Sequence, residues 1–309
     1  MADLKLTTAL GNYSHVKALK EGTTSSPRLE FEHIQVEPII GAFRRMVRNS
    51  EFDISEMAIS TYLCARDRGK ALTAIPVFPV RQFQHGGTAY NVKSGIKSPK
   101  DIEGKRVGVR AYTVTSGLWM RGILHEEYGV DLDTVTWVVN DEEHVAEYEL
   151  PDNVEVRIGA DFGKMLVAGE IDAAIGAGRV DSEDVKPLIP NAQQVAIEYF
   201  KKTGVYPINH TVVVQNQHLE ANPWLAEELF NLFRESKNVY LQRVAAGQGT
   251  PEEQKLIEDR AAIGPDPVPY GVEANRATLE AVIRFNIDQA IVRKAPKVEE
   301  IFAPGTVAS

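Results

Sequence analysis

The stretch SEFDISEMAIS, residues 50–60, indicates how the chain is organised, because a related unit recurs at residues 169–179, GEIDAAIGAGR. Both copies have a glutamate, an apolar residue, an aspartate and then a short, mainly apolar run. Each follows an amphipathic pattern, PIIGAFRRMVRN before the first and DFGKMLVAG before the second. The pattern predicts one unit used twice: a helix, a tight turn at the aspartate and a strand. The first copy also places Glu56 within its apolar run.

Strand and helix patterns alternate along most of the chain. Candidate strands at 4–10, 28–36, 72–80 and 106–110 and candidate helices at 38–49, 61–69 and 115–128 predict an α/β fold with mostly parallel strands. The C-terminal part reads as helices at 223–246, 251–262 and 273–292, and residues 195–215 read as an extended segment. We expect one copy of the repeat in each of two lobes, the first from residues 1–88 and 211–309 and the second from residues 89–210.

The bulk composition excludes several classes of protein. The chain has 309 residues, a formal net charge of −9 and 43% hydrophobic residues, which is typical of a soluble globular protein and disfavours nucleic acid or an anionic membrane as partner. Its one cysteine, Cys64, excludes an internal disulfide. The sequence shows neither a secretory signal nor a membrane-spanning apolar run, so we expect a cytoplasmic protein. Without metal-type histidine spacing or a glycine-rich phosphate loop, neither a metal nor a nucleotide is expected.

Several segments resemble known families. GIKSPKDIEGKRVGV (95–109), the helix at 115–128 and AGEIDAAI (168–175) resemble the second lobe of type II periplasmic binding proteins. That resemblance implies two α/β lobes facing each other across a ligand cleft. EFDISEMAIS, AIPVFPVRQFQH, WMRGILHEEYGV, YPINHTVVV and PYGVEANRATLEA together resemble the 4,5-dihydroxyphthalate decarboxylase family. The chain departs from this family at Ser14 and His15, where Asp-Arg is common, and at Arg110 and Ala111, where Pro-Glu is common.

The decarboxylase resemblance implies a cytoplasmic enzyme without an organic cofactor. Such an enzyme would convert 4,5-dihydroxyphthalate, or a close analogue, to protocatechuate or its counterpart. The expected partner is a small aromatic acid, and a homo-oligomer is compatible with the sequence. Two other interpretations stay open: a non-catalytic solute-binding protein of the same fold, and another enzyme on this fold, of the dihydroxynaphthoate synthase type. Product analysis would separate the three.

The chemistry of a decarboxylase suggests which residues to look for. A ring carbon that loses carbon dioxide needs a proton donor, and the substrate needs cations or helix N-termini for its carboxylates. His210 and His85 lie at the two predicted crossovers between lobes, and we predict that one of them, with His210 ahead, donates the proton. Glu56 is the alternative donor, or it orients a histidine or accepts a hydrogen bond from the substrate phenol. The other five histidines are expected to be structural.

The predicted ligand contacts come from both lobes. Arg81 follows a strand and is expected to bind a carboxylate; Arg110 and Arg179 have the same potential, each weighed against a surface role. The helix start TVTSGLW is expected to cap its helix, to hold a carboxylate, or to do both. The predicted substrate-binding residues are Arg81, Arg110, Tyr112, Thr113, Thr115, Ser116, Trp119, Ser60, Tyr13, Asn12 and Arg179.

Overall fold

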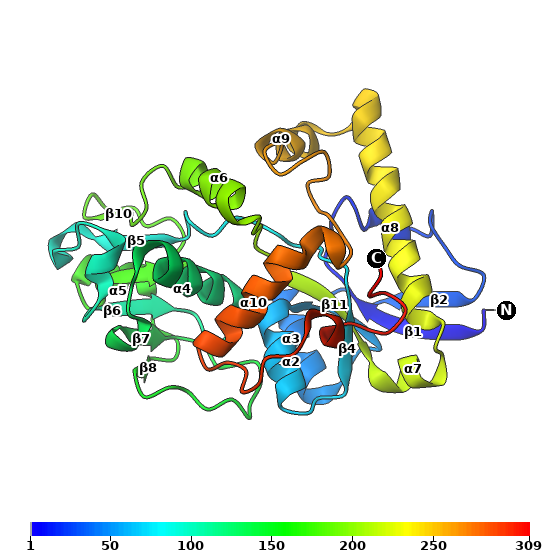
Figure 1. Ribbon diagram of the computed structural model, residues 1–309, viewed down its shortest axis with the longest axis horizontal. Helices are drawn as coiled ribbons and strands as arrows, with labels where there is room; N and C mark the ends of the chain where they lie inside the picture. Colours follow the sequence, from blue (N-terminus) through cyan, green and yellow to red (C-terminus); the bar gives the residue numbers. More distant parts are fainter. Residues whose placement is uncertain (1) are drawn as a thin grey trace.

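The computed structural model describes residues 2–309, and their strands form two separate sheets (Figure 1). The first has the order β2-β1-β3-β11-β4, with β1 (Leu4–Ala9), β2 (Leu29–His33), β3 (Ile54–Ala58), β4 (Leu72–Ile75) and β11 (His210–Gln215). The second has the order β10-β5-β9-β6-β7-β8, with β5 (Thr88–Asn91), β6 (Arg106–Val109), β7 (Thr136–Val139), β8 (Val154–Val156), β9 (Ala173–Ile175) and β10 (Val185–Pro187). The predicted α/β class, with a sheet in each of two lobes, is confirmed.

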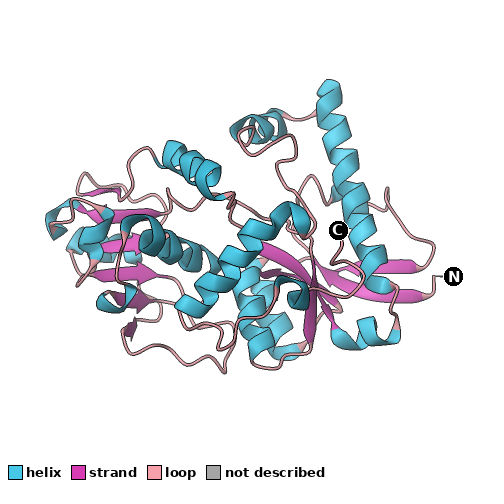
Figure 2. Ribbon diagram, in the orientation of Figure 1, coloured by secondary structure: helices cyan, strands magenta, loops and turns pink. Residues whose placement is uncertain are grey.

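Helices surround both sheets (Figure 2). They are α1 (Lys17–Lys20), α2 (Ile40–Asn49), α3 (Ile59–Asp67), α4 (Thr115–Tyr128), α5 (Phe162–Ala168), α6 (Ala192–Thr203), α7 (Asn216–Ala221), α8 (Leu225–Arg243), α9 (Pro251–Asp259) and α10 (Arg276–Asp288). The extended segment predicted for 195–215 is wrong over its first half, which forms α6. This helix buries Ala196 and Tyr199 at helical spacing and ends at Gly204, whose positive φ of 70° stops it.

The repeated aspartate has the same structural role in both lobes. Asp53 Oδ2 accepts hydrogen bonds from the backbone N–H and the hydroxyl of Thr7, both at 2.8 Å, and so ties β3 to the parallel strand β1. Asp172 Oδ2 accepts from the backbone N–H of Arg106 at 2.9 Å, which ties β9 to the parallel strand β6. In both copies of the sequence repeat, the aspartate therefore fixes the start of its strand to the neighbouring parallel strand.

The two crossovers between the lobes run side by side. Arg81 and Ile208 form an antiparallel bridge, and the backbone N–H groups of Asn209 and His210 both donate to the carbonyl of Val80, at 2.9 and 3.1 Å. This two-stranded ribbon fixes how His210 enters β11. The ribbon joins residues 80–82 to residues 207–210; Thr88 begins β5 of the second sheet, and His210 begins β11 of the first.

Helix α10 lies across the middle of the molecule and packs against α3 of the first lobe and α4 of the second (Figure 1). The approach to α4 is close, since a Cβ on Gly122 would lie 2.2 Å from the Phe285 ring. Ion pairs also join the lobes: Arg44 contacts Asp141 at 3.2 Å and Arg48 contacts Glu142 at 3.3 Å. Helix α2 is thereby held against the loop that follows β7.

We expect Asp53→Ala to lower the free energy of unfolding by about 1–3 kcal/mol at neutral pH, because two donors of Thr7 lose their acceptor. Burial raises the pKa of Asp53, but the hydrogen bonds from Thr7 and His218 outweigh it and leave that pKa below its usual value. The ionised form is thus favoured in the folded state, so its contribution is present above the ordinary aspartate pKa of about 3.9 and is lost as the pH falls through the folded value.

Urea unfolding at neutral pH and below pH 4 measures this difference, with the exposed Asp181→Ala as the matched control. If Asp53→Ala unfolds at the same urea concentration as Asp181→Ala, the hydrogen bonds between Asp53 and Thr7 do not hold β3 to β1.

Candidate active site

A cavity opens between the lobes where β3 and β11 meet the N-terminus of α4. It encloses about 640 Å³, including the part open to solvent. Its walls come from the first lobe (Ile40, Phe43, Ala58, Thr61), the crossovers (Gln82, Asn209, His210) and the second lobe (Arg110, Ala111, Thr113, Val114, Thr115, Ser116, His144). The cavity therefore joins basic and hydroxyl-bearing side chains with an aromatic wall.

A buried carboxylate lies directly behind this cavity. Glu56 has no exposed surface. Its Oε1 lies 2.6 Å from Nδ1 of His210 and accepts from the hydroxyl of Tyr13 at 2.8 Å, while Oε2 accepts from the backbone N–H of Gly11 at 2.9 Å. Burial alone raises the pKa of Glu56, but these three hydrogen bonds outweigh it and leave the pKa below its ordinary value. Glu56 is therefore ionised at neutral pH.

The Glu56 carboxylate dictates the state of the His210 ring. An ionised carboxylate only accepts hydrogen bonds, so Nδ1 of His210 carries the proton between them. The His210 side chain is 19% exposed, lines the cavity and packs its ring edge-on to Phe43 at 4.9 Å. Its second nitrogen, Nε2, is not among the sealed polar atoms of residues 2–309 and opens to the cavity. His210 can therefore take up or release a proton there, and Glu56 stabilises the imidazolium.

The opposite wall is suited to an anion. Helix α4 has 14 residues, its N-cap Val114 provides no side-chain cap, and its first turn carries Thr115 and Ser116 at the cavity. Backbone N–H groups in the first turn of a helix have no intrahelical acceptor and favour negative charge. Arg110 adds a guanidinium, about one-third exposed and paired with Asp141 at 3.0 Å. Together they can hold a carboxylate.

Several predicted residues lie at the cavity or directly behind it. His210, Arg110, Thr113, Thr115 and Ser116 line it. Glu56 and Tyr13 support His210 from behind, and the backbone N–H of Ser60 donates to the hydroxyl of Thr115 at 3.2 Å, which joins α3 to α4.

Tyr112 supports the wall from outside. Its backbone N–H donates to Glu143 at 2.5 Å and its ring lies 4.2 Å from the buried guanidinium of Arg121. The ring therefore packs on a cation and does not line the cavity.

Arg81 needs a correction, because it is buried away from the cavity. Its guanidinium donates to the carbonyls of Tyr206 at 2.6 Å and Pro269 at 3.1 Å and to the side chain of Asn275. These protein acceptors use the guanidinium donors that were expected to bind a substrate carboxylate. Arg81 instead joins the crossovers to the C-terminal segment.

His85 and Trp119 also lie in packed surroundings. Neither ring nitrogen of His85 has a hydrogen-bond partner among the described residues, the ring packs 5.3 Å from Tyr199, and burial lowers its pKa to about 4. A sealed, neutral imidazole cannot reach a ligand in the cleft. Trp119 donates to the carbonyl of Ile208 at 2.8 Å and packs edge-on to Phe285, so it belongs to the core.

Asn12 and Arg179 are exposed and lie outside the cavity walls. The side chain of Asn12 accepts from Lys20 at 2.6 Å. Neither residue contributes to the arrangement around His210.

Sequence reasoning missed some of the walls, above all His144. This residue follows β7 by five positions, and the carboxyl end of that strand faces the cleft. Ligands in α/β folds bind at the carboxyl ends of the strands, so the position of His144 after β7 is a signal that could have found it. Phe43 and Thr61 were missed because their sequence patterns are those of ordinary helix core.

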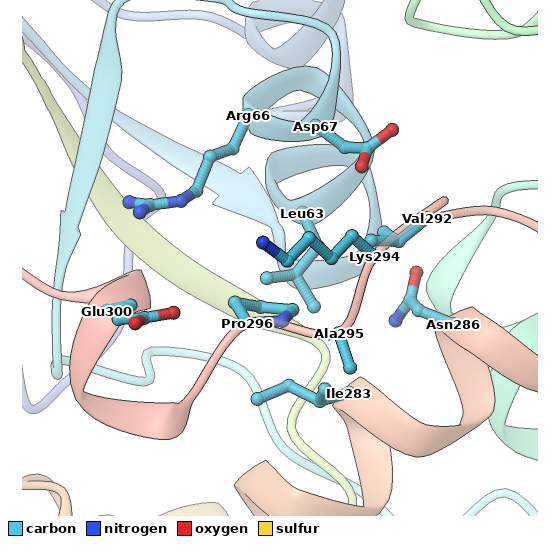
Figure 3. A pocket seen from close by; sticks show the side chains of 10 residues that line it. All are labelled: Leu63, Arg66, Asp67, Ile283, Asn286, Val292, Lys294, Ala295, Pro296 and Glu300. Atoms are coloured by element: carbon cyan, nitrogen blue, oxygen red, sulfur yellow. The ribbon is translucent and has the colours of Figure 1, made fainter.

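A second cavity lies on the other side of α3, between α10 and residues 292–300 (Figure 3). It is lined by Leu63, Arg66, Asp67, Ile283, Asn286, Val292, Lys294, Ala295, Pro296 and Glu300. Of its two carboxylates, Asp67 is already paired with Arg293 at 2.7 Å and Arg68 at 3.1 Å, and Glu300 accepts from the backbone N–H of Lys297 at 2.9 Å. With no histidine among its lining residues, this cavity has no group comparable to His210.

Comparison with known proteins shows the family to which the chain belongs. A 4,5-dihydroxyphthalate decarboxylase from Comamonas testosteroni is 30% identical over 100% of this chain and 99% of its own length. The chain belongs to the 4,5-dihydroxyphthalate decarboxylase family. Residues 41–242 also match the family model described as NMT1/THI5 like. The match to the decarboxylase family therefore extends over the whole chain.

Solved structures identify the fold of this decarboxylase family member. The periplasmic aliphatic sulphonate binding protein SsuA from Escherichia coli matches with a TM-score of 0.56 at 12% identity, covering 100% of both chains. The desulfurization enzyme DSZB matches with a TM-score of 0.55 at 13% identity, covering 98% of this chain and 97% of its own. The predicted type II periplasmic-binding-protein fold is confirmed.

No helix within residues 2–309 combines the length and apolar character that a membrane span requires. Over the same range, no group of three histidine, cysteine, aspartate or glutamate side chains is arranged as a metal site.

We expect Arg81→Ala to lower the free energy of unfolding by about 2–3 kcal/mol, because buried acceptors lose their donor. Arg179→Ala, an exposed arginine, is the matched control and should stay within about 0.5 kcal/mol of wild type. Chemical denaturation measures both. A fully stable Arg81→Ala protein that no longer binds an aromatic carboxylate would restore Arg81 as a ligand residue.

Proposed function

We propose that the protein is a cofactor-independent decarboxylase of a hydroxylated aromatic acid, 4,5-dihydroxyphthalate or a close analogue. The observation that carries the proposal is the His210 ring, which Glu56 holds at Nδ1 so that Nε2 opens into a cavity with an anion-binding wall. The family to which the chain belongs supports the reaction, and the name of the Comamonas relative supports the substrate.

The reaction starts with a substrate carboxylate at the N-terminus of α4 and Arg110. The imidazolium of His210 gives its Nε2 proton to the ring carbon that bears the departing carboxylate, and a para hydroxyl on the ring supplies electron density. The carbon–carbon bond to that carboxylate then breaks, carbon dioxide leaves, and the bonding electron pair restores the aromatic ring. Neutral His210 takes a new proton from water.

Glu56 supports the transfer without supplying the proton. Its pKa lies below the ordinary value, so it carries no proton to give at neutral pH. Its negative charge instead stabilises the imidazolium from which the proton leaves. Of the donors predicted from the sequence, His210 is thus favoured over Glu56, and also over His85, which is sealed from the cavity.

Carbon dioxide release from 4,5-dihydroxyphthalate tests the proposal, with phthalate as the ring that lacks hydroxyls. In heavy water the product should carry deuterium at the vacated carbon. A protein that binds the acid and returns it unchanged would be a solute-binding protein, and the proposed function would be wrong.

We expect His210→Asn to lower turnover by about 10²–10⁴-fold, the usual contribution of a positioned acid. Glu56→Gln should also lower turnover, because the amide no longer stabilises the imidazolium. His218→Asn is the matched control: that ring also pairs with a carboxylate, Asp53, at 2.7 Å, but outside the cavity. Steady-state kinetics should show wild-type turnover for the control, and near-normal turnover by His210→Asn would refute the assignment.

A further inference from the structure

A second imidazole, His144, faces the cavity from the opposite lobe. It lies in the loop after β7, is buried, and lines the cavity beside Arg110. Phe43 is packed edge-on by both imidazoles, with ring centroids 6.0 Å from His144 and 4.9 Å from His210. The two histidines therefore flank the same aromatic side chain.

The His144 ring is fixed from several directions. Its Nδ1 lies 3.2 Å from the hydroxyl of Thr61 in α3, and its backbone carbonyl accepts from Arg48 of α2 at 3.2 Å. The preceding residue, Glu143, accepts from the backbone N–H groups of Tyr112 and Thr113 at 2.5 and 3.1 Å. Thr61 thus orients the ring, and contacts to both lobes hold the loop that carries it, as a ligand-orienting group requires.

The remaining ring nitrogen is available to a ligand. Nε2 of His144 has no hydrogen-bond partner among residues 2–309, and it is not one of the sealed unpartnered atoms, in contrast to both nitrogens of His85. Burial lowers the pKa of His144 to about 4, with Arg110, Arg44 and Arg48 adding to the decrease and Asp141 opposing it. The ring is therefore uncharged at neutral pH, and its Nε2 is available for a hydrogen bond to a ligand.

A neutral imidazole selects for a particular ligand group. It is poorly matched to a carboxylate, which prefers the charged Arg110 and the N-terminus of α4. A hydroxyl suits it, because a hydroxyl can donate to Nε2 or accept from it. Ring hydroxyls are the groups by which a hydroxylated aromatic acid, such as 4,5-dihydroxyphthalate, differs from the unsubstituted acid, such as phthalate.

We propose that Nε2 of His144 hydrogen-bonds a ring hydroxyl of the substrate and so lets the site discriminate hydroxylated aromatic acids from unsubstituted ones. This inference rests on the proposed function for the class of ligand. His144 is a specificity-determining residue here, distinct from His210, which handles the proton.

A ligand-by-residue comparison tests the proposal. Binding of 4,5-dihydroxyphthalate and of phthalate is measured by calorimetry in a His210→Asn background, where turnover is slow, with and without His144→Phe. We expect the protein with His144 to prefer the hydroxylated acid by about 5–100-fold, the effect of leaving a buried polar group unpaired. In His144→Phe this preference should vanish while phthalate affinity changes less than about twofold.

A second variant guards against misfolding. Thr61→Val removes the hydroxyl that orients the ring, keeps the side-chain volume, and should reduce the preference without abolishing it. The proposal would be overturned if His144→Phe and Thr61→Val each lowered the affinity for both acids equally. It would also be overturned if the preference for the hydroxylated acid were unchanged in both variants. If His144 governs the preference but wild-type protein releases no carbon dioxide, only the proposed function falls. If neither acid binds, both fall.

Discussion

A carboxylate without exposed surface must have its charge satisfied by the protein, and this constraint at Glu56 organises the first lobe. Its partners come from two distant segments: Gly11 and Tyr13 in the loop after β1, and His210 at the start of β11. A buried charge left unpaired costs several kcal/mol, so these segments converge or the lobe loses stability. Because β11 pairs antiparallel with β3 and begins where the return crossover ends, the same interaction also sets the position of that crossover.

The two sides of the cleft carry different functional groups, a histidine on one side and anion-binding groups on the other. The first lobe supplies His210, and the second supplies Arg110 and the N-terminus of α4. Asp141 contacts both Arg44 of the first lobe and Arg110 of the second, so the group that holds the lobes together also orients a cavity cation. A carboxylate bound on the second lobe would thus present its ring to the imidazole of the first, which is the proximity that proton transfer to carbon requires.

The fold could be predicted from sequence because its signals are local. The aspartates of the repeat, Asp53 and Asp172, are recognisable by spacing alone, and each makes the same kind of bond to a neighbouring strand. The site was only partly predictable. Glu56 and His210 were both identified, but 154 residues separate them, and no pattern shows that they touch. Arg81 was misplaced because the carbonyls that satisfy its charge, from Tyr206 and Pro269, come from distant segments. His144 was missed because an isolated histidine in a loop carries no periodic signal.

The function of the site depends on one arrangement: ionised Glu56 holds the Nδ1–H of His210 and leaves Nε2 to transfer the proton in the cavity. Nitrogen-15 NMR of the histidine rings tests it directly, with His210→Asn used to assign the signal. We expect neutral His210 to carry its proton on Nδ1 and to lose this state in Glu56→Gln. A neutral His210 ring protonated on Nε2 in the wild-type protein, unaffected by Glu56→Gln, would contradict it.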